Sequence, residues 1–511
     1  MISIASERSP IRVTRSGVVV GFLAVGLALL PFSDFSITAR DPWGALGRLA
    51  MGLVTPKLSL PLATFEATLY TVAFAIVAVM AGAVAGLALA VFYRSPVVRS
   101  ACVFIRSIHE LFWALLFIQV YGISVTTGVL AIALPYSGIF AKVFSEYLDE
   151  ADRRPRDVLP EGTDSLSRFL FAGLPLAAPE MRTYTLYRLE CGIRSSAVLG
   201  FIGLPTLGFE LDAVFKNGDY SAVGAILLIY FTLIISIRLW LRWWLVPLYI
   251  CAALVVLAWI PSPPVGSGSL WRFLTSDIVP QPLRGADPTD PLVWAKFVEW
   301  LSMVLETQAL PGVFATLAVA QFGLILTALI AFLCFPLLLP KVVGPTGASA
   351  GHLGLVVGRS MPDYMLAFVF VQLLGPSMLP AILALGLHNG AIIAHLLGRQ
   401  AEQLSRGLRA DAPTGLDLAT YELTPRLYGN FIALCLYRWE IIIRETSILG
   451  MLGIATLGFH IDSAVGELRM DRVFVLLLAT AAVTLAIDAL SRRLRSAVGS
   501  SGLKVMPGPP Q

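Results

Sequence analysis

Apolar runs alternate with short polar segments along almost the whole chain of 511 residues. The longest runs without Asp, Glu, Lys or Arg are 67–93, 111–141, 243–271, 307–340 and 364–398. About 20 consecutive apolar residues are enough for a helix to cross the hydrocarbon core of a bilayer. The pattern therefore predicts an all-α protein, a polytopic bundle of transmembrane helices.

Breaks within the apolar runs set the expected number of spans. The runs 111–141 and 364–398 exceed one crossing, and each contains a break, at Gly122 and at 375–377, so each is expected to fold as a hairpin. Spans are expected near 17–33, 64–93, 103–121, 123–145, 184–209, 220–241, 244–260, 304–339, 361–375, 378–397, 430–459 and 473–490. Twelve spans fit best, and ten is the alternative.

The chain also contains an internal repeat. YRLECGIRSSAVLGFIGLPTLGFELD from Tyr187 and YRWEIIIRETSILGMLGIATLGFHID from Tyr437 are identical at 13 of 26 positions, where composition alone gives roughly one or two. RSIHELFWALLFIQVYG (106–122) likewise corresponds to RSMPDYMLAFVFVQLLG (359–375), and ATL at 67–69 to ATL at 315–317. We expect two domains, 1–243 and 244–511, each with about six spans. An even number of spans makes the repeats parallel.

The distribution of basic residues predicts the orientation. With the N-terminus in the cytoplasm, 28 of the 37 Lys and Arg residues fall on the cytoplasmic side, as the positive-inside rule requires. Both termini are then cytoplasmic, and the Pro-, Gly- and Ser-rich stretch 261–291 is an external loop. Basic residues precede the first apolar run, which could be a signal peptide. No small-x-small cleavage site follows cleanly, so an uncleaved first span is expected.

Charged pairs begin both copies of the repeated segment: Glu190 with Arg194, and Glu440 with Arg444. Glu four residues before Arg is the favoured order on a helix. Two further pairs have the same spacing in reverse order: Arg106 with Glu110, and Arg359 with Asp363. These residues either lie at solvated helix ends, where a pair contributes at most about 0.5 kcal/mol, or line the cytoplasmic mouth of a pathway between the halves.

Glycines follow the charged pairs in both copies: Gly200, Gly203 and Gly208, then Gly450, Gly453 and Gly458. Small residues allow membrane helices to approach closely, but these spacings differ from the GxxxG dimer motif. Either the two copies of this helix pack about a central axis, or the glycines fit neighbouring helices in their own half.

Composition excludes several other classes of protein. Hydrophobic residues make up 57% and charged residues 14%, and a net charge of +4 does not point to nucleic acid. The five cysteines form no CxxC pair, so neither a disulfide framework nor a metal site is expected. No Gly-Lys dipeptide occurs, so the chain has no phosphate-binding loop of its own. We expect no catalytic, cofactor or metal residues.

Two long polar segments, 146–183 and 398–429, are expected to be cytoplasmic loops. Loops longer than about 12–15 residues are uncommon unless they have a function. Docking of a soluble partner is the expected function.

The segments RSIHELFWALLF, GPSMLPAILALGLHNGAIIAHLLGR and YRWEIIIRETSILGMLG resemble the permease subunit of phosphonate-type ATP-binding-cassette importers. The resemblance covers roughly 60–240 and 300–495, as if two permeases were fused. It implies a type I importer fold with a pathway between the halves, in a bacterial inner membrane. It also implies two copies of a cytoplasmic ATPase that hold ATP and magnesium, and a periplasmic or lipid-anchored binding protein for phosphonate, phosphite or a related phosphorus oxyanion.

In the family that the chain resembles, the loop after the fourth span carries a coupling helix with an EAA---G pattern. Gly162 and Gly415 can occupy the glycine position, but Arg156 and Arg409 stand six residues earlier, where the family has Glu. The residues expected in the coupling loops are Arg156, Glu161, Gly162, Pro175, Arg409, Gly415 and Pro425.

Two other functions remain open. An ion-coupled secondary transporter of a small anion would use ionisable residues within the membrane, for which His388, His395 and Asp488 are candidates. A membrane enzyme would use His388, His395 and Asn389, but no second acidic or cysteine cluster completes a site.

Overall fold

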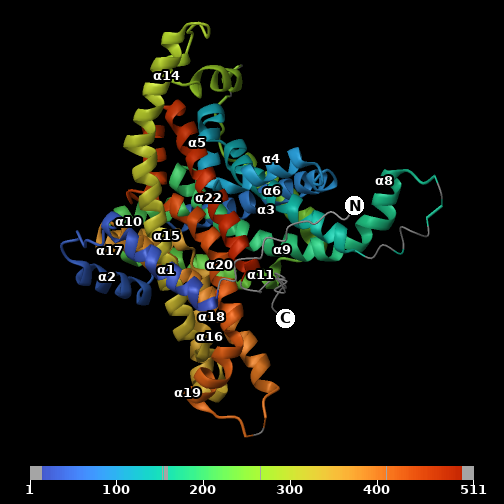
Figure 1. Ribbon diagram of the computed structural model, residues 1–511, viewed down its shortest axis with the longest axis vertical. Helices are drawn as coiled ribbons and strands as arrows, with labels where there is room; N and C mark the ends of the chain where they lie inside the picture. Colours follow the sequence, from blue (N-terminus) through green and yellow to red (C-terminus); the bar gives the residue numbers. More distant parts are fainter. Residues whose placement is uncertain are drawn as a thin grey trace, which may run out of the picture. The chain divides into compact units, whose positions relative to one another are not determined.

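The computed structural model describes residues 14–151, 154, 159–160, 162–264, 266, 268–409 and 411–497. All regular structure in these ranges is helical, which confirms the all-α prediction (Figure 1). Seven helices are long and apolar enough to cross a membrane, or up to eleven if each of four bent pairs is one span. The predicted span 244–260 coincides with a shorter apolar helix, Trp243–Ala258. The chain is therefore a multi-pass membrane protein.

The chain divides into two compact units. The first-half unit contains Asp41–Trp294 and Leu468–Leu477. The second-half unit contains Ala295–Glu467, together with 14–40 and 478–497.

The helices of the first-half unit are α2 (Pro42–Val54), α3 (Pro61–Val91), α4 (Pro96–Ser107), α5 (Glu110–Tyr121), α6 (Val125–Glu150), α8 (Ser165–Arg168), α9 (Leu174–Val198), α10 (Leu207–Lys216), α11 (Tyr220–Trp240), α12 (Val246–Ala258) and α13 (Ser269–Arg272). Those of the second-half unit are α1 (Arg15–Leu29), α15 (Leu310–Cys334), α16 (Pro340–Ser360), α17 (Asp363–Leu374), α18 (Met378–Arg406), α19 (Gly415–Asp417), α20 (Thr424–Leu449), α21 (Leu457–Gly466) and, from Leu478, the greater part of α22 (Met470–Ala497).

The same order of helices occurs in both units. α3–α6 and α9–α11 of the first-half unit match α15–α18 and α20–α22. The bends match as well: α4 meets α5 at 93° and α16 meets α17 at 89°, while the bends before α10 and α21 are 49° and 43°.

The helix starts define the corresponding positions used below. Aligning the first residues of α5 and α6 with those of α17 and α18 needs one constant shift in numbering and no gap. A second constant shift, smaller by three, aligns α9, α10 and α11 with α20, α21 and α22. The first shift is used for positions from α4 to α6, and the second from α9 onward.

One buried hydrogen bond joins the same helices in each unit. The N–H of Leu207 donates to Thr71 Oγ1 at 2.9 Å, and the N–H of Leu457 donates to Thr316 Oγ1 at 3.0 Å. Thr71 therefore occupies the place of Thr316. The sequence pairing of ATL at 67–69 with ATL at 315–317 was wrong by almost one helical turn, because two short matching triplets do not fix the register of a long apolar helix.

Replacing Thr316 with valine should destabilise the protein by about 1–3 kcal/mol, because the buried N–H of Leu457 loses its acceptor. The measurement is thermal unfolding of the detergent-solubilised protein. Thr232→Val is the control, because that exposed hydroxyl bonds only to the Leu228 carbonyl of its own helix. Equal midpoints for the two variants would contradict the capping role.

The first helix of each sequence half packs in the other compact unit. In α1, the Phe22 carbonyl accepts a hydrogen bond from Gln321 Nε2 of α15 at 2.8 Å, and the Phe22 ring meets Trp439 of α20 edge-on at 4.7 Å. α12, which begins the second half of the sequence, packs against α3. The two halves of the sequence are therefore exchanged at their first helices.

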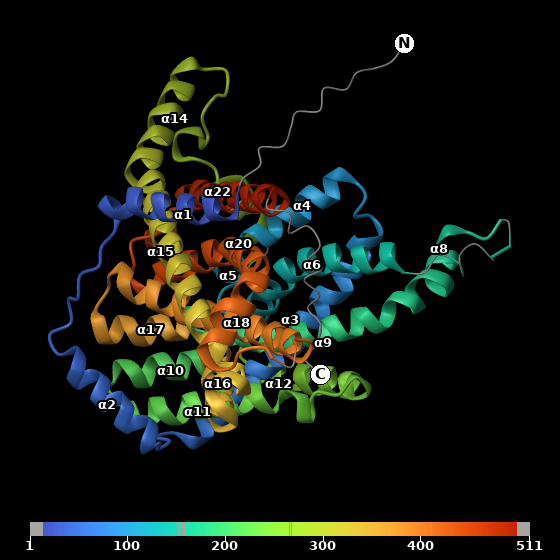
Figure 2. The same cartoon turned by 60° about the horizontal axis from the view of Figure 1, so that its bottom comes forward.

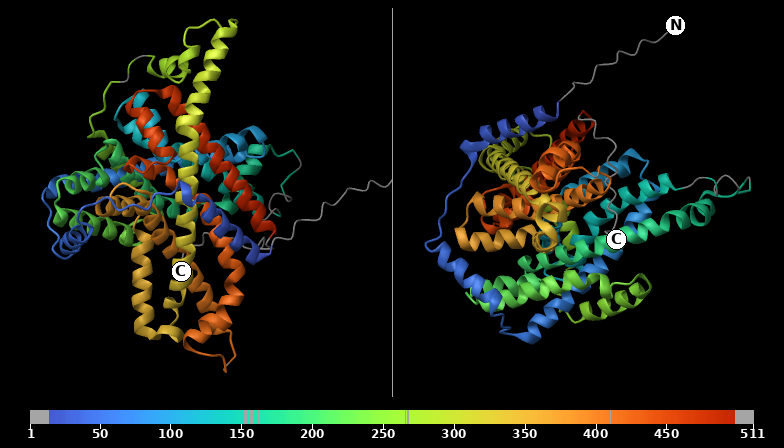
Figure 3. Two further views of the ribbon diagram at one scale, coloured as in Figure 1. Left: turned by 60° about the vertical axis from the view of Figure 1, so that its left-hand side comes forward. Right: turned by 90° about the horizontal axis from the view of Figure 1, so that it is seen from below.

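The helix α14 (Pro291–Val304) continues through a π-helical turn into α15. Figure 3 shows this run as a long rod, and it comprises 48 residues, Pro291–Leu338. At 1.5 Å per residue it is about 72 Å long, more than twice the hydrocarbon thickness of about 30 Å. The span expected at 304–339 thus continues beyond the bilayer. The stretch expected to be an external loop also contains α13.

The segments expected to be polar loops are largely helical, so that prediction was wrong. α6 continues to Glu150 and α18 to Arg406, and helix resumes at Ser165 and Gly415 (Figure 2). The side chains of Leu418, Leu423 and Leu427 are buried in one apolar cluster with α15 and α18. Amphipathic helices outside the lipid carry many polar residues, and their composition therefore resembles that of a loop.

Candidate functional site

Buried polar side chains join three helices inside the first-half unit. Ser195 Oγ of α9 donates to Glu110 Oε1 of α5 at 2.7 Å and lies 3.2 Å from the Tyr136 hydroxyl of α6. The Arg188 guanidinium lies over the Tyr136 ring, 5.5 Å from its centroid. His109 Nε2 lies 3.2 Å from Glu110 Oε2. These contacts link α5, α6 and α9 through side chains that are buried, as in Tyr136 and Ser195, or half-buried, as in Glu110 and Arg188.

The corresponding positions of the second-half unit are also polar. Asn389 Nδ2 donates to Glu445 Oε2 at 3.1 Å, and Arg438 Nη1 donates to Asn389 Oδ1 at 3.3 Å. Asp363, which is buried, occupies the place of Glu110. We call the two sets the polar layers: Glu110, Tyr136, Arg188 and Ser195 in one unit, and Asp363, Asn389, Arg438 and Glu445 in the other.

The members of the polar layers lie at different places along their helices: Glu110 and Asp363 are the first residues of α5 and α17, whereas Tyr136 and Asn389 lie well inside α6 and α18. Tyr136 lies about three turns after the start of α6, and Asn389 about three turns after the start of α18. Ionisable side chains in the packed interior of a membrane protein are costly, and they normally mark pathways or gates. The polar layers are therefore the candidate functional site.

The Glu–Arg pairs adjoin the polar layers. Arg194 lies 3.2 Å from Glu190, and Arg444 lies 3.6 Å from Glu440. Each Glu lies about four turns after the start of its helix. The four side chains are only 12–26% exposed. The interpretation as solvated helix ends was therefore wrong, because these helices begin much earlier than the apolar pattern indicated.

The reversed pairs do not lie along one helix. Arg106 lies in the last turn of α4 and Glu110 begins α5, beyond a bend of 93°. Arg359 and Asp363 are separated by the equivalent bend of 89°. The i,i+4 spacing in the sequence therefore does not describe their geometry.

The repeated glycines form a tight turn within each unit. A Cβ at Gly200 would overlap the backbone nitrogen of Phe209, and one at Gly450 that of Phe459. Gly203 and Gly453 adopt φ of +92° and +85°, which side chains with a Cβ rarely accept. These contacts lie within one half of the chain, which favours the local alternative over packing about a central axis.

The expected coupling residues lie around two helix starts. Arg156 and Glu161 fall outside the described residues. Gly162 and Gly415 have φ of +97° and +69°, just before or at the start of α8 and α19. The exposed Arg409 lies 3.8 Å from Glu422.

Pro175 and Pro425 occupy equivalent places in the two units. Each is the second residue of its helix, α9 or α20, directly after a π-helical turn (Phe169–Gly173 and Leu418–Leu423). Proline lacks an N–H and crowds the carbonyl four residues earlier. The wider π turn accommodates it.

The candidates for the other functions also have structural partners. Asp488 pairs with Arg492 one turn later on α22. His388 and His395 are both buried on α18, and the His395 ring lies 5.3 Å from that of His352.

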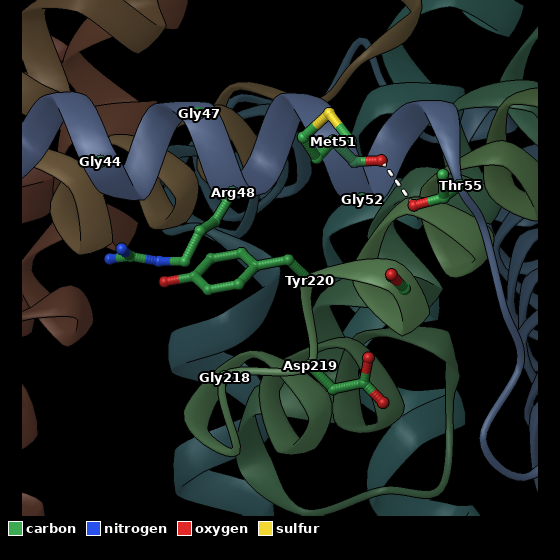
Figure 4. Close-up of a pocket in the computed structure, with 10 residues that line it drawn as sticks. Gly44, Gly47, Arg48, Met51, Gly52, Thr55, Gly218, Asp219 and Tyr220 are labelled. Carbon is green, nitrogen blue, oxygen red and sulfur yellow. Dashed lines mark hydrogen bonds between the residues drawn. The ribbon is translucent and has the colours of Figure 1, made fainter.

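A hollow of about 510 Å³ lies between α2 and the start of α11 (Figure 4). The Arg48 guanidinium lies 5.8 Å from the Tyr220 ring centroid at its wall. A hydrogen bond from the Ser59 hydroxyl and one from the N–H of Ala222 hold the pKa of Asp219 below its ordinary value of 3.8. The hollow is therefore lined by a positively charged side chain, Arg48, and a negatively charged one, Asp219. It shares no residue with either polar layer.

Sequence comparisons decide the class of protein. The chain is 25% identical over 420 residues to the phosphate-import permease protein PhnE of Mycolicibacterium smegmatis, covering 78% of this chain and 77% of that protein. It is 31% identical over 131 residues to the phosphite transport system permease protein PtxC of Stutzerimonas stutzeri, covering 25% of this chain and 48% of that protein. A putative cryptic phosphonate transport system permease protein PhnE2 of Escherichia coli is 26% identical over 102 residues, 20% of this chain and 84% of that protein.

The chain is a homologue of phosphate, phosphite and phosphonate transport permeases. No protein-family model and no solved structure matches it. As a permease it is a transport component and not an enzyme, so the histidines of α18 are not assigned to catalysis. Of the polar layers, the sequence indicated only Glu110, Asp363 and Asn389. Tyr136, Ser195 and Glu445 were missed, because the corresponding positions hold different residue types. Arg188 and Arg438 were also missed, although they are identical and lie in the repeated segment.

Proposed function

We propose that this permease forms the pathway of an ATP-driven importer of a phosphorus oxyanion, with both halves of the chain contributing to it. The relatives that carry the proposal are named for phosphate, phosphite and phosphonate transport. These solutes share a tetrahedral phosphorus with anionic oxygens. The substrate class is therefore phosphonate, phosphite, phosphate or a close relative.

The length of the relatives supports a fusion of two permeases. The phosphate-import relative matches over three quarters of both chains, whereas the phosphite relative is about half as long as this chain. The repeated order of helices, with its matching bends, agrees with this. In this proposal the repeats are parallel, lie in a bacterial inner membrane and have both termini in the cytoplasm, as the distribution of Lys and Arg favours.

Two copies of a separate ATPase, which hold ATP and magnesium, would dock at the tips between α6 and α8 and between α18 and α19. A periplasmic or lipid-anchored binding protein would deliver the solute from the other side. The equivalent π turns behind the two tips, each followed by a proline, support this assignment, because they give each tip the same helical base. Neither a nucleic acid nor a cofactor in this chain is part of the proposal.

The polar layers and the adjoining Glu–Arg pairs would act as the gate of the pathway. Each layer connects its helices by hydrogen bonds. Rearrangement of such a network can favour one of two packings when ATP or a loaded receptor binds.

Reconstituted transport tests the proposal. Proteoliposomes with the ATPase and binding protein should take up labelled phosphite or phosphonate only with internal ATP. Replacing 154–164 or 407–414 with Gly-Ser sequence of equal length should lower ATP-driven uptake at least about tenfold, while the same replacement at 261–264 should not. Uptake driven by a proton gradient without ATP would instead support an ion-coupled secondary transporter.

A further inference from the structure

A cluster of basic side chains lies between α16 and α18, apart from the polar layer. It comprises His352 and Arg359 of α16, and His395 and Arg399 of α18. On α16 the two residues are seven apart, and on α18 four apart, so each pair occupies one helical face. His352 and Arg399 are exposed, whereas His395 is buried. The cluster therefore extends from the surface into the packed interior.

Helix packing brings the two faces together. A Cβ at Gly358 would lie 3.0 Å from that of Ala391, and Leu355 packs in one buried cluster with Ala391 and Ala394. One turn further, the rings of His352 and His395 lie 5.3 Å apart. The basic residues thus flank an apolar contact that fixes their spacing.

The buried end of the cluster has an unused polar atom. His395 is 6% exposed, and its Nδ1 has no hydrogen-bond partner among the described residues. A buried polar group without a partner costs about 1–3 kcal/mol, so such a group needs an explanation. The charged and titratable groups whose electrostatic interactions affect the His395 ring are Arg359, His352 and Arg399. None of them is a carboxylate. A hydrogen-bond acceptor is the partner that His395 Nδ1 lacks.

The first-half unit has a different set of charges at the corresponding positions. The numbering shift that aligns α5 and α6 with α17 and α18 places His352, Arg359, His395 and Arg399 at Arg99, Arg106, Lys142 and Glu146. Glu146 lies in the same region as Arg99 and Arg106, since the charges of all three interact with the Tyr93 side chain. In that unit the protein supplies the negative charge. In the second-half unit an arginine stands in its place.

We propose that His352, Arg359, His395 and Arg399 bind a tetrahedral phosphate-type oxyanion. Arginine presents planar donors that match two oxygens of such an anion, and the N–H at His395 Nδ1 would donate to a third. Both the headgroup of an anionic phospholipid and a free oxyanion have this chemistry. The site lies outside the polar layer, so the proposal does not depend on which solute the permease carries.

Binding of inorganic phosphate to the purified full-length chain tests this site. In nanodiscs of zwitterionic lipid, equilibrium dialysis with labelled phosphate should show binding that Arg399→Glu weakens at least about tenfold. Glu146→Arg should raise the phosphate bound per chain, because it removes the internal carboxylate from the corresponding site. Arg406→Ala is the matched control, since this exposed arginine of α18 pairs with Glu402 at 2.7 Å, outside the cluster.

A second arm distinguishes the source of the oxyanion. In nanodiscs that contain phosphatidic acid, native mass spectrometry should detect a retained anionic lipid on the unaltered chain, and not on Arg399→Glu, if the headgroup is the ligand. Binding of free phosphate alone would assign the site to a soluble oxyanion. If neither ligand binds, or if a correctly folded Arg399→Glu binds both as the unaltered chain does, the proposal is overturned. Unfolding midpoints verify that the variants are folded.

Discussion

Gly450→Ala is expected to prevent the accumulation of folded protein. The added methyl group would overlap the backbone nitrogen of Phe459 and the carbonyl carbon of Gly458. Backbone atoms cannot rotate away as a side chain can, so the destabilisation should reach about 3 kcal/mol or more. The measurements are membrane yield, and elution and thermal unfolding of the solubilised chain. Gly200→Ala should behave in the same way, because its Cβ would overlap the Phe209 nitrogen.

Gly354→Ala is the control for these variants. Gly354 lies within α16, and a Cβ added there would meet no atom within 4 Å. Alanine is favoured over glycine in a helix by up to about 1 kcal/mol, so this variant should be unchanged or slightly more stable. A stable Gly450→Ala protein would contradict the tight turn before α21.

Glu440→Ala is expected to destabilise the protein by about 3 kcal/mol, and more than Glu190→Ala does. Removing one partner of a buried ion pair leaves the other charge uncompensated in a poorly solvated place. The side chains of Glu440 and Arg444 are 12% and 22% exposed, whereas those of Glu190 and Arg194 are 26% and 24% exposed. Unfolding midpoints of the single variants provide the comparison.

A double-mutant cycle separates the charge interaction from packing. Glu440→Gln retains the shape of the side chain, and a cycle of Glu440→Gln with Arg444→Ala isolates the coupling between the two residues. A coupling energy below about 0.5 kcal/mol, typical of an exposed pair, would refute the role given to their burial.

The apolar pattern predicted those features that one residue type determines alone. The hairpin breaks at Gly122 and Gly375 are confirmed, since both glycines end a helix with positive φ. The bend between Arg106 and Glu110 was missed, because neither glycine nor proline marks it. The polar layers were missed for a different reason. Tyr136 corresponds to Asn389 and Ser195 to Glu445, so a search for identical residues passes over positions that share only their place in the fold.

The extent of the helices beyond the bilayer depends on tertiary packing. Leu418, Leu423 and Leu427 are buried by contacts with α15 and α18, which residues 398–429 alone do not reveal. A polar stretch that contains Pro425 is typical of a loop when it is considered without its neighbours.

The exchange of first helices constrains how the protein is synthesised. α1 is synthesised before α15, and its hydrogen-bonding partner Gln321 follows Phe22 by 299 residues. At about 5–20 residues per second, translation of this distance takes roughly 15–60 s. During this interval the bilayer alone must hold α1. The sequence of α1 is compatible with this delay, because the helix is apolar on all sides. Only 11% of its membrane-spanning stretch is buried even in the completed fold.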